Sequence, residues 1–136
     1  MQQPHLKQID FPRGIDRFPN IRIHKDADEE LRTIYKRVSA GGQAKLAGAL
    51  NQRFRYLSDN LGREQFHSEW FEILSDVDPT MRSLRLMMAA PIGNLRLLYV
   101  IMESQAVILV SFIEHKKKDY RPSIALAIKR YENTFL

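Results

Sequence analysis

The sequence predicts an α+β fold, in which a small antiparallel sheet carries an N-terminal helical hairpin on one face and is followed by a short C-terminal helix. Two segments between residues 26 and 61 place apolar side chains at helical spacing. The region from residue 84 to 113 alternates or runs apolar in short blocks separated by turn residues, as strands do. With 136 residues, of which 44% are hydrophobic, the chain has enough apolar surface for one folded domain.

Residues 1–20 predict an irregular N-terminal arm, because they contain three prolines and show no hydrophobic period. They also lack the apolar core of a signal peptide. The single folded domain is therefore expected over residues 21–136. It begins with a short strand at 21–24, where apolar and polar residues alternate.

Two helices are expected next, joined as a hairpin by a short connection. Asp26 and Glu29 have the spacing of a capping box, in which two side chains satisfy backbone N–H groups at a helix start. The pair Gly41–Gly42 is expected to end this helix, and Gly62 to end the second. The core-facing stripes are Leu31, Ile34, Tyr35 and Val38 in the first helix, and Leu46, Leu50, Phe54, Leu57 and Leu61 in the second.

About three antiparallel strands and a closing helix complete the predicted order. Residues 70–74 fit either a strand or a buried turn. The clearer strands are 84–88, 95–102 and 107–113, with turn residues between the first two and a tight polar connection between the last two. Pro122 suits the first turn of the closing helix.

The net charge of +5 is distributed unevenly along the chain. Residues 1–80 hold twelve Lys and Arg against twelve Asp and Glu, whereas residues 81–136 hold nine against four. The whole excess therefore lies in the last 56 residues, beside aromatic and histidine side chains. This placement favours a phosphate-bearing partner, although a solvated basic surface explains the same charge.

Two arginines in the predicted strands are expected on one face of the sheet. In a regular hairpin, Arg85 lies opposite Leu98 and Met87 lies opposite Arg96. Both guanidinium groups then project to the same side. A face with two such charges needs water, an anion or carboxylate partners, because a buried unpaired charge costs several kcal/mol.

Either carboxylate partners or a bound phosphate satisfy these arginines. Glu72 and Glu114 are the candidate carboxylates. The basic run 115–121 follows the last strand and is expected beside the same face, where it adds lysines, an imidazole and a phenol. Such a group suits attack of a ribose 2′-hydroxyl on its adjacent phosphate, a reaction that needs a base, an acid and positive charge.

The histidines give no indication of a metal site. His5, His24, His67 and His115 lack the spacing of paired metal ligands. We therefore expect neither a metal nor another cofactor. No stretch reaches the roughly 18 uninterrupted apolar residues of a spanning helix, so no membrane partner is expected. The absence of cysteine favours a reducing, cytoplasmic location.

The carboxy-terminal half resembles toxins of the RelE/ParE superfamily, and within it the RelE/HigB-like branch. The similarity lies in "NLRLLYVI" (94–101) and in "ILVSFIEHKKKDYRPSIALAIKRY" (108–131). In the family, a strand with an arginine before an aliphatic-aliphatic-Tyr segment precedes a strand that ends in a basic loop and a helix. The resemblance covers roughly residues 21–134 and is strongest over 82–131.

The resemblance implies the toxin of a type II toxin–antitoxin pair that cleaves mRNA in the A site of the ribosomal 30S subunit. Its expected partners are a cognate antitoxin, mRNA and the ribosome. His115 and Tyr120 are alternative proton-transfer groups. The predicted catalytic residues are Arg85, Arg96, His115, Lys118 and Tyr120, and the predicted RNA-binding residues are Arg82, Lys116, Lys117 and Arg121.

Two other functions fit the same residues. One is the ParE branch, whose members poison DNA gyrase without nuclease activity. The other is a non-catalytic relative whose basic face binds nucleic acid through phosphates, with an affinity that falls steeply with salt. Assays of supercoiling and of mRNA cleavage distinguish the three functions.

Overall fold

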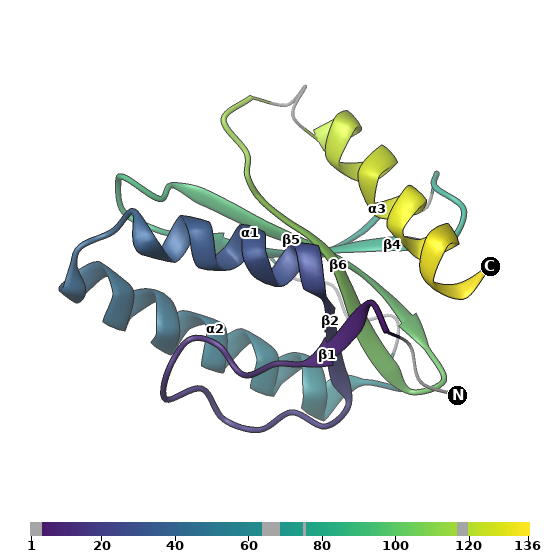
Figure 1. Cartoon of the computed structure of the whole chain (residues 1–136), viewed down its shortest axis with the longest axis horizontal. Helices are drawn as coiled ribbons and strands as arrows, with labels where there is room; N and C mark the ends of the chain where they lie inside the picture. Colours follow the sequence, from purple (N-terminus) through teal and green to yellow (C-terminus); the bar gives the residue numbers. More distant parts are fainter. Residues whose placement is uncertain (1–3, 64–68, 75, 117–119) are drawn as a thin grey trace.

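The computed structural model describes residues 4–63, 69–74, 76–116 and 120–136. Figure 1 shows the helices and strands coloured in chain order from purple to yellow. The elements are β1 (Leu6–Gln8), β2 (Ile21–His24), α1 (Lys25–Lys36), α2 (Ala40–Asn60), β3 (Phe71–Leu74), β4 (Met81–Met87), β5 (Asn94–Met102), β6 (Gln105–Ile113) and α3 (Tyr120–Phe135).

The predicted small antiparallel sheet with an N-terminal helical hairpin is wrong. In the described part of the chain the sheet has six strands, in the order β1-β2-β6-β5-β4-β3. It is mixed, because β2 runs parallel to β6 and pairs Ile21 with Ala106. Two strands also precede the helices, so the hairpin is not N-terminal. A parallel pair so far apart in sequence leaves no local pattern to detect, since only tertiary folding brings the two strands together.

The segment expected to be an irregular arm contributes to both the sheet and the core. Its strand β1 pairs antiparallel with β2 and forms one edge of the sheet. Ile9 and Phe18, on the connection between these strands, are 7% and 5% exposed. Residues 4–20 are thus packed against the rest of the domain.

The helix boundaries differ from the predicted ones because other side chains provide the caps. His24, and not Asp26, is the N-cap of α1, and its Nδ1 atom accepts a hydrogen bond from the Asp26 backbone N–H at 3.0 Å. Ser39 is the N-cap of α2 and accepts from the backbone of Gly42. The two glycines expected to end α1 therefore lie in the first turn of α2. A side-chain cap satisfies an otherwise unpaired backbone group at each of these helix starts.

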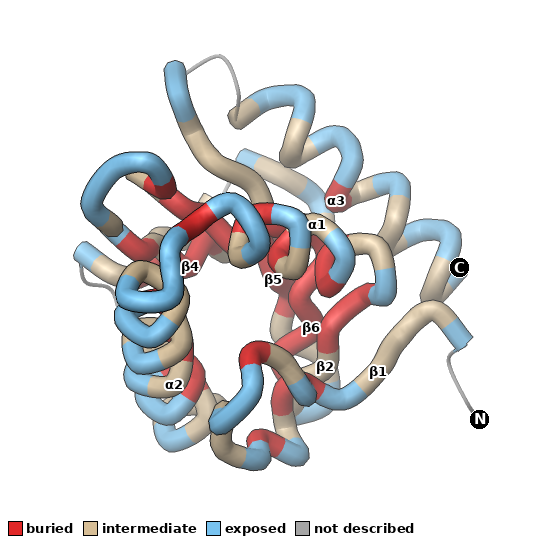
Figure 2. Tube along the Cα trace, turned by 60° about the vertical axis from the view of Figure 1, so that its left-hand side comes forward, coloured by how far each residue is buried: buried red, intermediate tan, exposed pale blue. Residues whose placement is uncertain are grey.

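The sheet has a hydrophobic core on each face. Helices α1 and α2 pack on one face against side chains such as Leu84, Leu97 and Ile108. Helix α3 packs on the other face against Leu98 and its neighbours. Buried positions gather along β5 and β6 in the middle of the sheet, whereas the outward side of α2 is exposed (Figure 2). Because side chains alternate along a strand, each residue of β4 and β5 is assigned to one of these two faces.

Among the described residues, no helix combines the length and the apolar character that crossing a membrane requires.

Candidate functional site

Arg85 and Arg96 are direct partners on neighbouring strands. The pairing of β4 with β5 places Arg85 opposite Arg96 and Met87 opposite Asn94. The predicted register, with Arg85 opposite Leu98, is wrong by two residues because β5 begins at Asn94. A shift by two keeps every side chain on its face, so the two arginines still share one side of the sheet.

This shared side is the face on which α3 packs. Arg96 lies two residues from Leu98 along β5, and Leu98 belongs to the core under α3. The helix begins at Tyr120, which contacts Arg96, and extends from there over the apolar part of the face. The polar site therefore lies at the end of the face where α3 starts.

Arg96 is the more buried of the two arginines, with 5% of its surface exposed. Its Nη1 atom donates to the Tyr120 hydroxyl at 3.1 Å and to the Ser83 hydroxyl at 3.3 Å. Its guanidinium carbon lies 4.7 Å from the centre of the Tyr120 ring, and its Nε atom lies 3.4 Å from Oε2 of Glu114. Arg96 thus holds the phenol in place and has a carboxylate as counter-ion.

Tyr120 connects Arg96 to a second carboxylate. The phenol donates a hydrogen bond to Oε1 of Glu72 at 3.2 Å while it accepts from Arg96. Burial raises the pKa of Tyr120 to about 12, with Arg96 acting to lower it and the nearby charge of Glu72 acting to raise it. The hydroxyl therefore stays protonated at neutral pH, in keeping with the hydrogen bond that it donates to Glu72.

Arg85 lies beside a cavity that adjoins these groups. The cavity has a volume of about 190 Å³, and it is lined by Glu69, Trp70, Phe71, Glu72, Ser83, Arg85 and Arg96. The Nε atom of Arg85 is buried and has no hydrogen-bond partner among the described residues. A buried donor of this kind favours an acceptor from a ligand or from water. Two guanidinium groups, a phenolic donor and a carboxylate acceptor together suit the binding of an oxyanion and the transfer of a proton.

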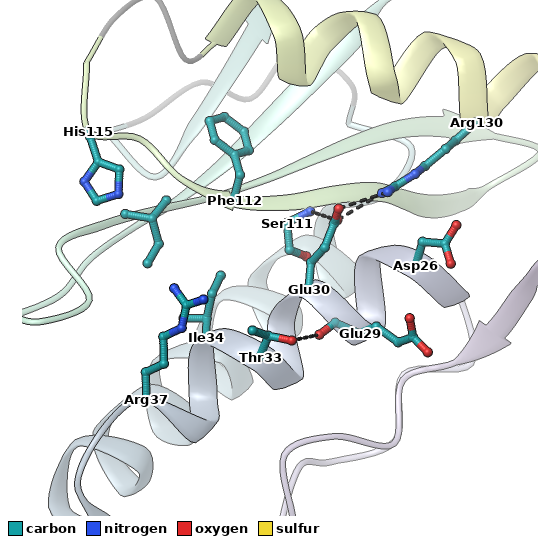
Figure 3. A pocket seen from close by; sticks show the side chains of 11 residues that line it. Asp26, Glu29, Glu30, Thr33, Ile34, Arg37, Ser111, Phe112, His115 and Arg130 are labelled. Carbon is teal, nitrogen blue, oxygen red and sulfur yellow. Dashed lines mark hydrogen bonds and ion pairs between the residues drawn. The ribbon is translucent and has the colours of Figure 1, made fainter.

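His115 is not part of this cavity. It lines a separate groove of about 560 Å³ between α1 and β6, which shares no residue with the cavity at Arg85. Figure 3 shows His115 and Arg37 toward one end of this groove, with Arg130 and Asp26 toward the other. Of the two predicted proton-transfer groups, Tyr120 contacts Arg96, whereas His115 lines the separate groove.

The predicted RNA-binding residues are also separated. Arg82 pairs with Tyr99, whose ring belongs to the core under α1 and α2, so strand alternation places Arg82 on the opposite face from Arg85. Lys116 and Arg121 are exposed near the start of α3. Lys117 and Lys118 lie outside the described residues.

Three residues of the site were not predicted to have a catalytic role. The sequence predicts Glu72 and Glu114 only as charge partners of the arginines, and it gives no indication of a role for Ser83. Glu72 directly opposes Ser83 in the pairing of β3 with β4, which places both side chains on the same face as Arg85. The sequence contained a signal for Glu72, since residues 70–74 fit a strand, but not the register that places it here.

A scan against protein-family models and searches of curated proteins and of solved structures found no match to this chain. Within the described ranges, no group of three His, Asp or Glu side chains is arranged to hold a metal ion.

Proposed function

We propose that the chain is the toxin of a type II toxin–antitoxin pair and acts as a ribosome-dependent mRNA endoribonuclease. The single observation that carries this proposal is the contact chain from Arg96 through Tyr120 to Glu72, with Arg85 directly opposite Arg96. It joins a phosphate-binding pair of guanidinium groups to a proton donor and a proton acceptor. RNA cleavage by its own 2′-hydroxyl requires these three capacities.

In the proposed reaction, the Glu72 carboxylate removes the proton of the ribose 2′-hydroxyl, and the 2′-oxygen attacks the adjacent phosphorus atom. Arg85 and Arg96 stabilise the negative charge that develops on the phosphate oxygens. The bond from phosphorus to the 5′-oxygen then breaks, and the Tyr120 hydroxyl donates its proton to that oxygen. The products are a 2′,3′-cyclic phosphate and a free 5′-hydroxyl.

The hydrogen bond between Tyr120 and Glu72 restores the starting state. After the reaction Glu72 carries the proton taken from the sugar, while Tyr120 has lost its own. Because the two groups lie 3.2 Å apart, the proton passes from Glu72 to Tyr120 and both regain their original form. The high pKa of the phenol favours this proton transfer from Glu72 to Tyr120.

The test compares cleavage by single variants at the site. Arg85→Ala and Glu72→Gln should each reduce the cleavage of translated mRNA by about 10²–10³-fold, since each removes one group that acts in the transition state. Tyr120→Phe removes the proton donor but keeps the ring. Lys45→Ala, an exposed change on α2, is the matched control and should cleave as the wild type does. The readouts are growth arrest in bacteria and cleavage sites mapped in a translation extract.

Two results would overturn the proposal in different ways. Inhibition of purified gyrase without mRNA cleavage would assign the chain to a gyrase-directed function. RNA binding that falls steeply with salt, without cleavage in the presence of ribosomes, would assign it to non-catalytic binding.

The proposed activity also defines partners and a location. A nuclease of translated mRNA works in the cytoplasm on the ribosome and requires an antitoxin to restrain it. An antitoxin with acidic residues and an amphipathic helix would complement the basic site and the groove between α1 and β6. Co-expression with the product of a neighbouring gene should abolish the growth arrest.

A further inference from the structure

The chain contains one tryptophan, and it forms part of the wall of the arginine cavity. Trp70 precedes β3 directly, and its backbone carbonyl accepts a hydrogen bond from the Arg85 N–H at 2.7 Å. Trp70 is therefore the residue next to β3, the strand that carries Glu72, and its backbone is hydrogen-bonded to the backbone of Arg85. A ligand whose phosphate lies at Arg85 has its neighbouring groups close to Trp70.

Other residues fix the indole in position. The guanidinium carbon of Arg53 lies over the ring at 3.7 Å from its centre, and Tyr56 meets the ring edge-on with 6.2 Å between the centroids. Arg53 also donates from Nε to the backbone carbonyl of Arg85 at 3.3 Å. Arg53 thus connects the indole to β4, the strand that carries Arg85. An aromatic group held in this way loses little conformational entropy when a ligand stacks on it.

Trp70 also lines two hollows of the surface. One is the cavity at Arg85 and Arg96, and the other is a depression of about 710 Å³ along α2 that Tyr56 and Trp70 line together. Trp70 is half-buried: it packs in part against the core under α1 and α2, and it also lines both hollows.

We infer that Trp70 is a stacking platform for a nucleobase next to the phosphate bound by Arg85 and Arg96. Single-stranded nucleic acid is commonly held by positive charge along its backbone together with aromatic rings on which its bases stack. The inference rests on the proposed function for its ligand, RNA, but it is a statement about binding and not about cleavage. It assigns to the segment before β3 a role in positioning the substrate.

The single tryptophan makes the inference directly measurable. The probe is a short single-stranded DNA oligonucleotide, which cannot be cleaved by 2′-hydroxyl attack, and its matched control is the same oligonucleotide with abasic sites. Stacking of a base on Trp70 should quench the tryptophan fluorescence in a saturable manner. The abasic oligonucleotide has the same phosphates and should leave the fluorescence unchanged.

Variants of Trp70 give a second measurement. Trp70→Leu should weaken binding of a labelled oligonucleotide by about 5- to 150-fold, the usual range for loss of one base stack. Trp70→Phe keeps an aromatic face and should retain most of the affinity. Phe135→Leu, on α3, is the control for loss of an aromatic ring elsewhere and should bind as the wild type does. If Trp70→Leu does not fold, the quenching of the wild-type protein remains as the test.

The outcomes separate this inference from the proposed function. Equal fluorescence changes with normal and abasic oligonucleotides, or no change with either, would overturn the stacking role even if mRNA is cleaved. Base-dependent quenching would support it even if no cleavage occurs.

Discussion

Glu30 and Arg130 lie 100 residues apart in the sequence, yet their side chains meet in a two-point ion pair with both nitrogen–oxygen distances at 2.9 Å. The pair joins α1 to α3 around the edge of β6, where β2 no longer pairs (Figure 3). Glu30 accepts from the Ser111 N–H at 3.1 Å, and Arg130 donates to the Leu109 carbonyl at 2.8 Å. The two side chains thus satisfy backbone groups that a neighbouring strand would otherwise satisfy.

We predict that Glu30→Ala destabilises the fold by about 1.5–3 kcal/mol, the usual worth of hydrogen bonds to a charged group. The change leaves the Ser111 N–H and the Arg130 guanidinium without their carboxylate. Glu29→Ala, an exposed change one residue earlier on α1, is the control and should stay close to the wild type. Urea unfolding measures both, and equal losses in the two variants would contradict the role of the ion pair.

Arg96 is expected to be as important for folding as for chemistry. Arg96→Met should cost about 3–5 kcal/mol, because it leaves the Glu114 carboxylate, 13% exposed, as an uncompensated charge. The double variant Arg96→Met/Glu114→Met should recover more than half of that loss. Thermal unfolding of the two proteins checks this expectation, and a double variant no more stable than the single one would refute it. For this reason Arg85 is the better site at which to test catalysis.

The raised pKa of Tyr120 predicts a loss of stability in alkaline solution. The folded state retains the phenolic proton up to a pH of about 12, whereas the unfolded chain releases it near its ordinary pKa of about 10. The free energy of unfolding should therefore be unaffected by this group below about pH 10 and should fall as the pH rises from there. Unfolding of Tyr120→Phe should show a shallower fall than the wild type above pH 10 and a parallel course below pH 9. Identical slopes above pH 10 would show that Tyr120 does not cause the effect.

The N-cap of α1 predicts a loss of stability in mild acid. Burial lowers the pKa of His24, and the positive charges of Arg130, His5 and Lys25 lower it further, while Asp26 raises it. The neutral ring is needed because its Nδ1 atom accepts the backbone hydrogen bond. The unfolded chain binds this proton near pH 6.5 and the folded chain only at lower pH, so stability is retained above about 6.5 and falls below it.

The substitution His24→Asn separates titration from capping. Asparagine is a favourable N-cap residue but does not titrate, so the variant should show a smaller loss of stability between pH 7 and pH 5. At pH 8 the two proteins should differ by less than about 1 kcal/mol. The measurement is the urea midpoint as a function of pH. An equally steep fall in the variant would assign the acid sensitivity to other groups.

The sequence by itself determined the local structure of most of the chain. Helical spacing from Leu46 to Leu57 and the strand runs of β4, β5 and β6 arise from interactions between residues close in sequence, and the elements formed where those patterns lie. Strand alternation also placed Arg85 and Arg96 on one face, because an error of two residues in the register leaves the face unchanged.

Only the tertiary structure decided how distant segments meet. The parallel pairing of β2 with β6, the addition of β1 and the ion pair of Glu30 with Arg130 join segments far apart in the sequence. The tertiary structure also places His115 in a separate groove and the Glu72 carboxylate within hydrogen-bonding distance of the Tyr120 hydroxyl. These contacts depend on packing and on satisfying backbone groups at a sheet edge, and neither leaves a repeating pattern along the chain.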